Sequence, residues 1–300
     1  MIRFRRHFPV LALSMVVLLC CAASPLLAAP KLDAATDSFV PSLLLRHPWL
    51  DPQGRPLPFT SDQEILDFLR SAEVVGSELV GEGMNQTRKV LLQGRGLQMH
   101  AAFRDVHVDR FLPDPLLPNF EKCHRDDYRF EVAAYRLSRL LGLRVVPPTV
   151  LRKVDGHEGS LQAWVERSMM EKQRREKGIE PPDQWYWMSQ MLTMRLFDNL
   201  VGNVDRHQGN LLIDSSWEIW LIDHTQAFRR WPEPHSPEKL QYCRRDVWEN
   251  LVRLDEQAVR DCCAGLLRDP EIKALMLRRD RVLAEIRKHI TESGADKILF

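Results

Sequence analysis

The sequence predicts an α+β fold with two lobes: a small antiparallel β lobe that carries one helix, and a larger lobe made of helices. Two observations carry this prediction. Five short segments of strand-like composition, separated by turn residues, all lie before residue 168. From residue 181 onward, apolar residues recur at helical spacing instead. With 300 residues, of which 44% are hydrophobic, the chain can bury a core for both lobes.

The first residues predict a secretory signal peptide over 1–29. "MIRFRRHFPV" is basic, "LALSMVVLLCCAA" is apolar but short for a membrane span, and small residues near Ala28 and Ala29 would permit cleavage. Leu19 stands before Cys20 where a lipoprotein signal has a small residue, so we expect no lipid anchor. An uncleaved anchor is the alternative. We therefore expect an extracytoplasmic protein, periplasmic, secreted or in a secretory-pathway lumen, with no stable membrane span after cleavage.

Charge and cysteine content limit the remaining possibilities. The formal net charge of +1 gives no general attraction to nucleic acid or to a membrane surface, so no nucleic-acid partner is expected. Cleavage leaves four cysteines, an even number in an oxidising compartment, which predicts one or two disulfides whose pairing stays open. These cysteines are Cys123, Cys243, Cys262 and Cys263. No C-x-x-C pair is present, so a cysteine zinc site is not expected.

The small lobe is predicted over residues 61–168, after an extended, proline-rich lead-in at 30–60. A capping-box pattern begins a helix over 61–73. A second, amphipathic helix over 128–143 has Glu131 beside its apolar stripe, where a carboxylate would face inward only if a cation met it. The five strands are predicted at 73–80, 88–93, 97–106, 148–154 and 160–167, with an irregular loop at 107–127.

The helical lobe is predicted over residues 169–300. Its first helix, at 181–202, has a stripe of tryptophan, methionine and leucine that we expect in the core. The stripe consists of Trp185, Met188, Leu192 and Leu196. Two more helices are predicted at 245–267 and 270–292, with a proline-rich surface loop at 229–240.

A Gly-x-Gly pattern lies between the first two strands. Gly81 and Gly83 would let backbone N–H groups approach phosphate oxygens, because no side chain is in the way. The layout of strand, glycine loop and hairpin is that of a phosphate-covering loop, although an ordinary turn uses the same residues.

The stretch "GNVDRHQGNLLID", residues 202–214, gathers polar side chains between apolar strands. Asp205 precedes Asn210 by five residues, the spacing between the catalytic Asp and the metal-binding Asn of protein kinases. Asp223 follows the short strand "EIWLI", so a hairpin would return it beside Asp205. Carboxylates and an amide oxygen are hard ligands suited to Mg²⁺. The alternative is a polar turn stabilised by its own side chains.

These motifs resemble a known superfamily. "GNVDRHQGN" followed by "LIDHTQAF" resembles the catalytic motifs of phosphatidylinositol 3- and 4-kinases. It is still more similar to the atypical secreted kinases of the Golgi casein kinase and Four-jointed type, with their bacterial relatives and the HipA-like kinases. The upstream motifs "GEGMNQTRKVLL", "HAAFRDV", "FEVAAYRLSRLLGLRVVPPTV" and "SLQAWVE" occur in the order expected for such kinases. The resemblance implies a bilobal protein-kinase-like fold.

The resemblance also implies roles for individual residues. Asp205 would be the catalytic base, Arg206 and His207 would brace the loop or touch the γ-phosphate, and Asn210 and Asp223 would hold the metal ions. The implied nucleotide-binding residues are Gly81, Gly83, Arg104, Glu131, Trp164 and Val165.

Two positions depart from the pattern of that superfamily. Arg104 stands where these kinases usually have lysine, and Thr225 stands where many kinases have the glycine of D-F-G. Arginine keeps the positive charge, but its planar fork is not equivalent to an ammonium group.

The resulting hypothesis is an exported kinase that uses ATP with Mg²⁺ or Mn²⁺ and phosphorylates a hydroxyl of a protein, glycan or lipid. The competing hypothesis is a kinase-like module that acts by binding nucleotide or a partner, because Arg104 is unusual and ATP is scarce outside the cytoplasm. A third reading is transfer of the nucleotide itself.

Overall fold

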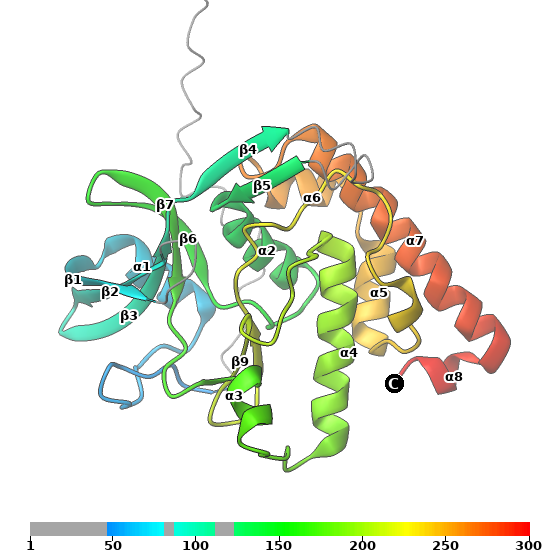
Figure 1. Ribbon diagram of the computed structural model, residues 1–300, viewed down its shortest axis with the longest axis horizontal. Coiled ribbons are helices and arrows are strands. Elements are labelled where there is room, and N and C mark those ends of the chain that lie inside the picture. Colours follow the sequence, from blue (N-terminus) through cyan, green and yellow to red (C-terminus); the bar gives the residue numbers. More distant parts are fainter. Residues whose placement is uncertain (1–46, 81–86, 112–122) are drawn as a thin grey trace, which may run out of the picture. The chain divides into compact units, whose positions relative to one another are not determined.

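The computed structural model describes residues 47–80, 87–111 and 123–300 (Figure 1). The expected signal peptide and the glycines Gly81 and Gly83 lie outside the described residues. Within the described ranges, no helix has both the length and the apolar character that crossing a membrane requires.

The small lobe contains a five-stranded antiparallel sheet in the order β1-β2-β3-β7-β6, which confirms the predicted strand number and orientation. β6 and β7 are joined by a two-residue turn, Asp155-Gly156, in which both φ angles are positive. This turn starts β7 three residues earlier than the sequence predicts. The strands are β1 (Glu73–Val80), β2 (Thr87–Gly94), β3 (Leu97–Arg104), β6 (Thr149–Val154) and β7 (His157–Ala163).

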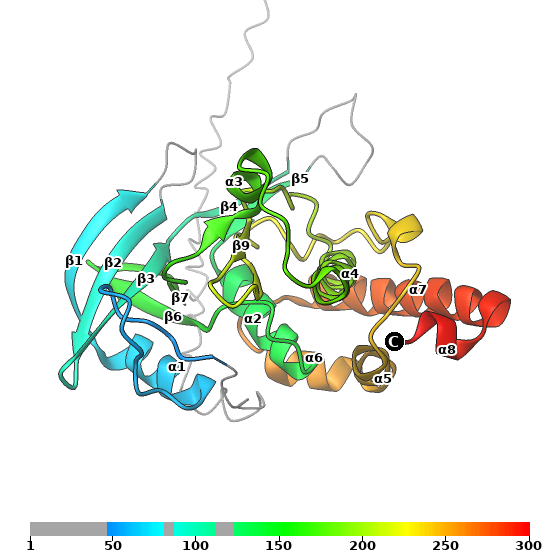
Figure 2. The same ribbon diagram turned by 90° about the horizontal axis from the view of Figure 1, so that it is seen from below.

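The two faces of this sheet differ because side chains alternate along each strand. Val90, Ala101 and Leu161 belong to the buried face that faces α1 (Asp62–Ser71), a helix that begins with the expected capping box (Figure 2). The opposite face carries Arg104, which reaches α2 (Arg129–Leu140). The predicted helix α2 is confirmed, and the cation that meets its Glu131 is Arg104 of the sheet.

The region predicted as an irregular loop, 107–127, contains an antiparallel hairpin of β4 (His107–Phe111) and β5 (Cys123–Asp127). The prediction was wrong because these strands are rich in charged residues and have no apolar alternation to reveal them. The Asp127 N–H donates to the Thr225 carbonyl at 2.9 Å, so a tertiary contact orders the second strand.

The helical lobe is built around α4 (Gln184–Val201) and α7 (Asp269–Ser293), which pack together. The single helix predicted over 245–267 is wrong. Leu254 has an extended backbone, and the Asp255 carboxylate accepts from the Ala258 N–H at 2.7 Å to begin a second helix. The other helices are α3 (Glu171–Glu176), α5 (Arg245–Arg253), α6 (Glu256–Cys262) and α8 (Ala295–Ile298), with a 3₁₀ turn η2 (Pro237–Lys239).

The apolar stripe of α4 is only partly in the core. Leu192 and Leu196 are buried, as expected, but Trp185 and Met188 are 65% and 47% exposed. The expectation fails for the first turns of α4, where Trp185 contacts the ring of Phe300 rather than the core.

A short three-stranded sheet has the order β10-β9-β8, with β8 before the motif at 202–210 and the other two strands after it. β9 (Leu211–Ile213) and β10 (Ile219–Leu221) form an antiparallel hairpin, here called the β9–β10 hairpin, which confirms the hairpin predicted before Asp223. β8 (Met169–Met170) completes this sheet.

The described cysteines do not form the expected disulfides. Cys243, Cys262 and Cys263 are buried free thiols, and the side chain of Cys123 lies outside the described residues. Burial raises the pKa of the Cys243 thiol to about 12, so this thiol stays protonated and is a poor nucleophile.

Candidate active site

The loop from Asn203 to Asn210 follows α4, which ends at Gly202 in a left-handed conformation. The Asn203 Oδ1 accepts from the Asp205 N–H at 3.1 Å, and the Asp205 carbonyl accepts from the Asn210 Nδ2 at 3.2 Å. The loop is thus closed on itself by its own amides, as the polar-turn reading expects. The Asp205 carboxylate, however, is half-buried and pairs with no cation of the described chain.

Arg206 turns inward and braces the loop. Its guanidinium donates to both carboxylate oxygens of Asp198, at 2.9 and 3.1 Å. Its Nη1 also donates to the carbonyls of Asn210 and Ile222, at 2.6 Å each, and its Nη2 lies 2.9 Å from the Nε2 of His224. Of the two roles expected for Arg206, the geometry favours bracing, because its donors are already engaged.

His207 behaves differently from Arg206. Its side chain is exposed, and its Nδ1 accepts from the Gly209 N–H at 3.0 Å. This local bond shapes the turn and leaves Nε2 without a bond to any described residue. A contact with a γ-phosphate stays a prediction for this residue.

The β9–β10 hairpin places the two expected metal ligands at its open end. Leu211 pairs with Leu221, and the Ile222 N–H donates to the Asn210 carbonyl at 3.2 Å. Asp223 follows directly, with a left-handed φ of 60° that a non-glycine residue rarely adopts. A strained backbone conformation persists only where the surrounding structure holds it in place, and such conformations cluster at functional sites.

The donor atoms at this end of the hairpin suit a hard divalent cation. The Asn210 Nδ2 donates to the Asp205 carbonyl, and no described group donates to the Asn210 Oδ1, so this oxygen is available as a ligand. Asp223 accepts one bond, from the Thr225 Oγ1 at 3.0 Å, and pairs with no described cation. Oxygen ligands of this kind fit Mg²⁺ or Mn²⁺. The described residues contain no cluster of three or more His, Cys, Asp or Glu that could hold a metal alone, so phosphate or water oxygens would have to complete the shell.

The expected pair between Glu131 and a cation is present. The Arg104 Nη1 lies 3.2 Å from the Glu131 Oε1, and the His224 Nδ1 lies 3.5 Å from the Glu131 Oε2. Glu131 is completely buried, and burial alone would raise its pKa. The charge of Arg104 and the close contact of His224 outweigh burial and lower the pKa of Glu131 to about 2.

These contacts form one continuous chain of charged and polar groups, which we call the ion-pair chain: Asp198, Arg206, His224, Glu131 and Arg104. It links the catalytic-loop candidate to α2 and β3, on which Glu131 and Arg104 lie. The sequence does not single out Asp198, and for His224 it indicates only a packing or hinge residue. Asp198 could have been found by the argument used for Glu131, because it is a carboxylate on an apolar helix that must meet a cation.

Arg104 retains donors that the chain does not satisfy. Its Nε and Nη1 have no aligned hydrogen bond despite their burial, and the buried hydroxyl of Ser160, opposite Arg104 in the sheet, has none either. Buried polar atoms are normally satisfied, so orphan donors here are consistent with a polar ligand or water at this place.

Trp164 and Val165 follow β7 and connect the lobes. The Trp164 N–H donates to the His100 carbonyl at 3.1 Å, and the Lys89 Nζ lies 4.8 Å from the centre of the Trp164 ring. The Val165 carbonyl accepts from the Ser168 Oγ at 2.8 Å. The Val165 N–H has no hydrogen bond to another described residue, so it is available as a backbone donor.

Known structures share this fold. The chain is similar to hydra Fam20, solved with sugar, at 16% identity and a TM-score of 0.59 over 79% of this chain and 91% of that chain. It is also similar to the Golgi casein kinase, solved with Mn and ADP bound, at 14% identity and a TM-score of 0.59 over 79% and 78% of the two chains. No family model and no curated protein matches the sequence. At these identities the likeness establishes the fold, and the kinase-like fold predicted from the motifs is confirmed.

Proposed function

We propose that this protein is an exported kinase that transfers the γ-phosphate of ATP to a hydroxyl of a protein, glycan or lipid. One observation carries the proposal. The carboxylates of Asp205 and Asp223 have no cationic partner in the described chain, although the guanidinium of Arg206 lies next in sequence to Asp205 and is committed to Asp198. Carboxylates left unpaired around a braced loop are suited to a reacting hydroxyl and to a metal ion.

Each implied group has residues that fit it. Asn210 and Asp223 would hold Mg²⁺ or Mn²⁺, which supplies charge neutralisation at the transferred phosphoryl group. The unsatisfied donors of Arg104 would take the oxygens of the α- and β-phosphates, and Glu131 would hold that guanidinium in place. The N–H of Val165 would donate to the nucleotide base.

Asp205 would act on the acceptor. The acceptor oxygen attacks the γ-phosphorus, and its proton passes to the Asp205 carboxylate. The bond between the γ-phosphorus and the β,γ-bridging oxygen breaks, and ADP leaves with that electron pair. Bonds at both ends of its backbone, from the N–H to Asn203 and from Asn210 to the carbonyl, hold the segment from which the Asp205 carboxylate projects, so little backbone reorganisation would be needed during the step.

The test uses the protein with ATP labelled at either the α or the γ position, with Mg²⁺ or Mn²⁺, and with protein, glycan and lipid acceptors. Transfer of the γ label supports the kinase, and transfer of the α label identifies nucleotidyl transfer. The Asp205→Asn variant should lose about 10²-fold or more in turnover while nucleotide binding is nearly kept. Asp261→Asn on α6 is the matched control, because Asp261 is also half-buried and, among the described residues, its carboxylate bonds to Gln257 alone.

The competing function is a module that binds nucleotide without turnover, which Arg104 in place of lysine would favour. Binding of nucleotide without transfer of either label, together with no effect of Asp205→Asn, would replace the kinase by this module. Export is tested separately: amino-terminal sequencing of secreted protein should find a start near Ala29 or Pro30, and a start at Met1 would favour an anchor.

A further inference from the structure

Residues 47–57, which precede α1, form a closed loop that we call the N-terminal strap. The Leu57 N–H donates to the Trp49 carbonyl at 2.7 Å, and the Asp51 N–H donates to the Arg55 carbonyl at 2.8 Å. The Asp51 carboxylate accepts from the backbone and from the Nε of Arg55, at 2.8 and 2.6 Å. These bonds fix the strap internally, so it can act as a rigid piece rather than as a loose connection.

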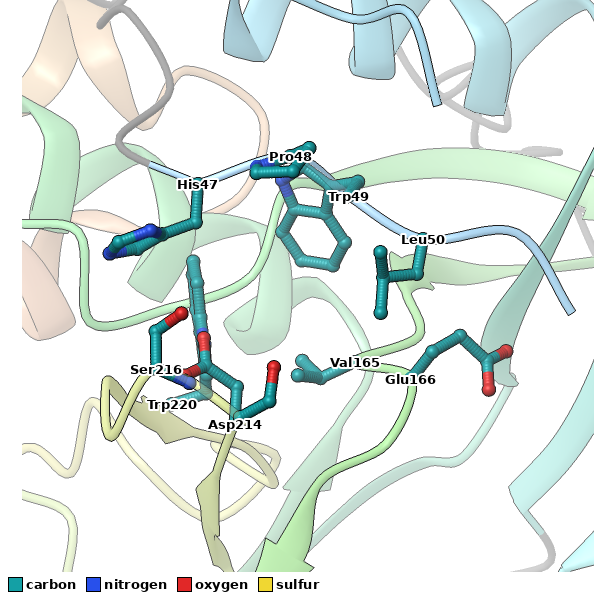
Figure 3. Close-up of a pocket in the computed structure, with 10 residues that line it drawn as sticks. His47, Pro48, Trp49, Leu50, Val165, Glu166, Asp214, Ser216 and Trp220 are labelled. Atoms are coloured by element: carbon teal, nitrogen blue, oxygen red, sulfur yellow. The ribbon is translucent and has the colours of Figure 1, made fainter. Parts of the chain in front are cut away.

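The strap contacts two other segments around a cavity of about 140 Å³ (Figure 3). Its residues 47–50 line one side of the cavity, the linker residues Val165 and Glu166 line a second, and the β9–β10 hairpin lines the third. The linker is itself fixed to the sheet, because the Glu166 carboxylate lies 2.5 Å from the Nδ1 of His100 on β3. The strap therefore lies where the linker between the lobes meets the hairpin that carries Asn210 and Asp223.

The strap contacts the β9–β10 hairpin through a pair of tryptophans and through His47, whose Nε2 lies 3.7 Å from the Glu218 Oε1. The rings of Trp49 and Trp220 have centroids 5.2 Å apart and are tilted by 57°, and Trp49 is only 7% exposed. The Trp220 Nε1 donates to the Asp214 Oδ2 at 2.9 Å, while the Asp214 Oδ1 accepts from the N–H groups of Ser216 and Glu218. Trp220 is thus fixed by the strap and by the turn of its own hairpin.

The other end of this hairpin carries the expected metal ligands. Trp220 lies three residues before Asp223, and its partner in the ladder, Leu212, lies two residues after Asn210. At about 3.3 Å per residue, the turn and the ligands are separated by only about 10 Å of paired strand. A paired strand of this length transmits a shift, because moving β10 alone would break its bonds to β9.

We propose that the N-terminal strap is a positioning element for the metal–nucleotide site, acting through the contact of Trp49 with Trp220. The strap holds β10 against the linker Val165–Glu166 and thereby fixes Asp223 and Asn210 relative to the site of the nucleotide base. This inference rests on the proposed function. It assigns a role to a segment that precedes the kinase-like motifs and that contributes no residue to the chemistry.

The test measures Mn²⁺ binding to the full chain with and without ADP, by calorimetry and by the electron paramagnetic resonance signal of unbound Mn²⁺. Trp49→Ala should weaken Mn²⁺–ADP binding about tenfold, and Trp49→Phe should restore most of it, because a second aromatic ring can still pack on Trp220. Trp248→Ala is the control: Trp248 is half-buried, and so less buried than Trp49, and its ring packs near Arg287 of α7 rather than on Trp220. It should change Mn²⁺–ADP binding less than about twofold.

A spectroscopic readout separates positioning from loss of fold. The tryptophan pairs Trp49–Trp220 and Trp187–Trp217 should each give a coupled circular dichroism signal. A folded Trp49→Ala protein should lose the first signal and keep the second, whereas Trp248→Ala should keep both. Should Trp49→Ala fail to fold, Trp49→Leu replaces it, since leucine keeps apolar bulk without the ring, and it should weaken Mn²⁺–ADP binding about threefold. If the folded Trp49 variants bind Mn²⁺–ADP as the wild type does, the positioning role is wrong while the proposed function stands. If the wild type binds no Mn²⁺–ADP, the proposed function fails, and the positioning role fails with it.

Discussion

Replacing Glu131 by glutamine should remove a large, pH-dependent part of the stability of this protein. Glu131 is completely buried between Arg104 and His224, at 3.2 and 3.5 Å. Glutamine has nearly the same shape but no charge, so it leaves the buried guanidinium of Arg104 without its counterion. Breaking a buried pair in this way typically destabilises a protein by about 3–5 kcal/mol.

The magnitude of the pH dependence follows from the pKa of Glu131. The pKa falls from 4.5 to about 2 on folding, because the charge of Arg104 and the contacts of His224 outweigh the effect of burial. This difference corresponds to about 3 kcal/mol of stability. Because the folded-state pKa lies below the unfolded one, this stability is fully present above pH 4.5 and is lost as the pH falls toward 2. By pH 3, about 2 kcal/mol of it should be lost.

The assay is urea unfolding of the wild type and of Glu131→Gln at a series of pH values between 7 and 3. The wild type should lose stability more steeply with acid than Glu131→Gln, so that the two curves converge by about 2 kcal/mol between pH 7 and pH 3. Glu176→Gln is the control, because Glu176 is exposed and has only a loose contact of 3.9 Å with Lys172. Arg104→Lys keeps a cation beside Glu131 and should retain most of the pH dependence.

Parallel curves for the wild type and Glu131→Gln would refute the reasoning, because Glu131 would then titrate alike in the folded and unfolded states. A Glu131→Gln protein as stable as the wild type at pH 7 would show that Arg104 finds another partner. In either case the ion-pair chain would not hold Arg104 in place for a nucleotide.

Two further predictions concern the loop and the hairpin. Asp223→Ala should abolish the dependence of nucleotide binding on Mg²⁺ or Mn²⁺. The melting temperature should stay the same, because no described cation pairs with the Asp223 carboxylate and none is left unpaired. Unchanged metal-dependent binding in calorimetry would remove Asp223 from the site. Arg206→Ala should destabilise the fold by about 3–5 kcal/mol, because it leaves the buried Asp198 without its cation and removes three further bonds, to Asn210, Ile222 and His224. The double variant with Asp198→Asn should recover part of this loss in urea unfolding. Additive losses in the double variant would contradict the pairing.

Local patterns in the sequence were sufficient to predict several structural features of this protein. Period-two and helical spacing predict the five strands and the helix that carries Glu131, because these patterns depend only on which residues share a face. The capping residues of α1 are likewise local. The spacing from Asp205 to Asn210, and the strand before Asp223, predict the hairpin because a short chain has few ways to return.

The tertiary structure decided the features that depend on contacts between distant segments. The β4–β5 hairpin lacks an apolar pattern, and the break at Leu254 in the predicted helix has no proline or glycine to mark it. Trp185 is exposed although its spacing fits the core, because the first turns of α4 do not reach that core. Spacing along one helix cannot tell how far the neighbouring elements extend.

The same limit applies to the candidate site. The sequence by itself predicts which residues would carry the chemistry of a kinase, since Asp205, Asn210 and Asp223 form a local motif. Only the tertiary structure decided that Arg206 braces Asp198 and that His224 joins Glu131. The physical reason is that a buried charge needs a counterion within a few ångströms, and which one it meets depends on chain segments tens of residues apart.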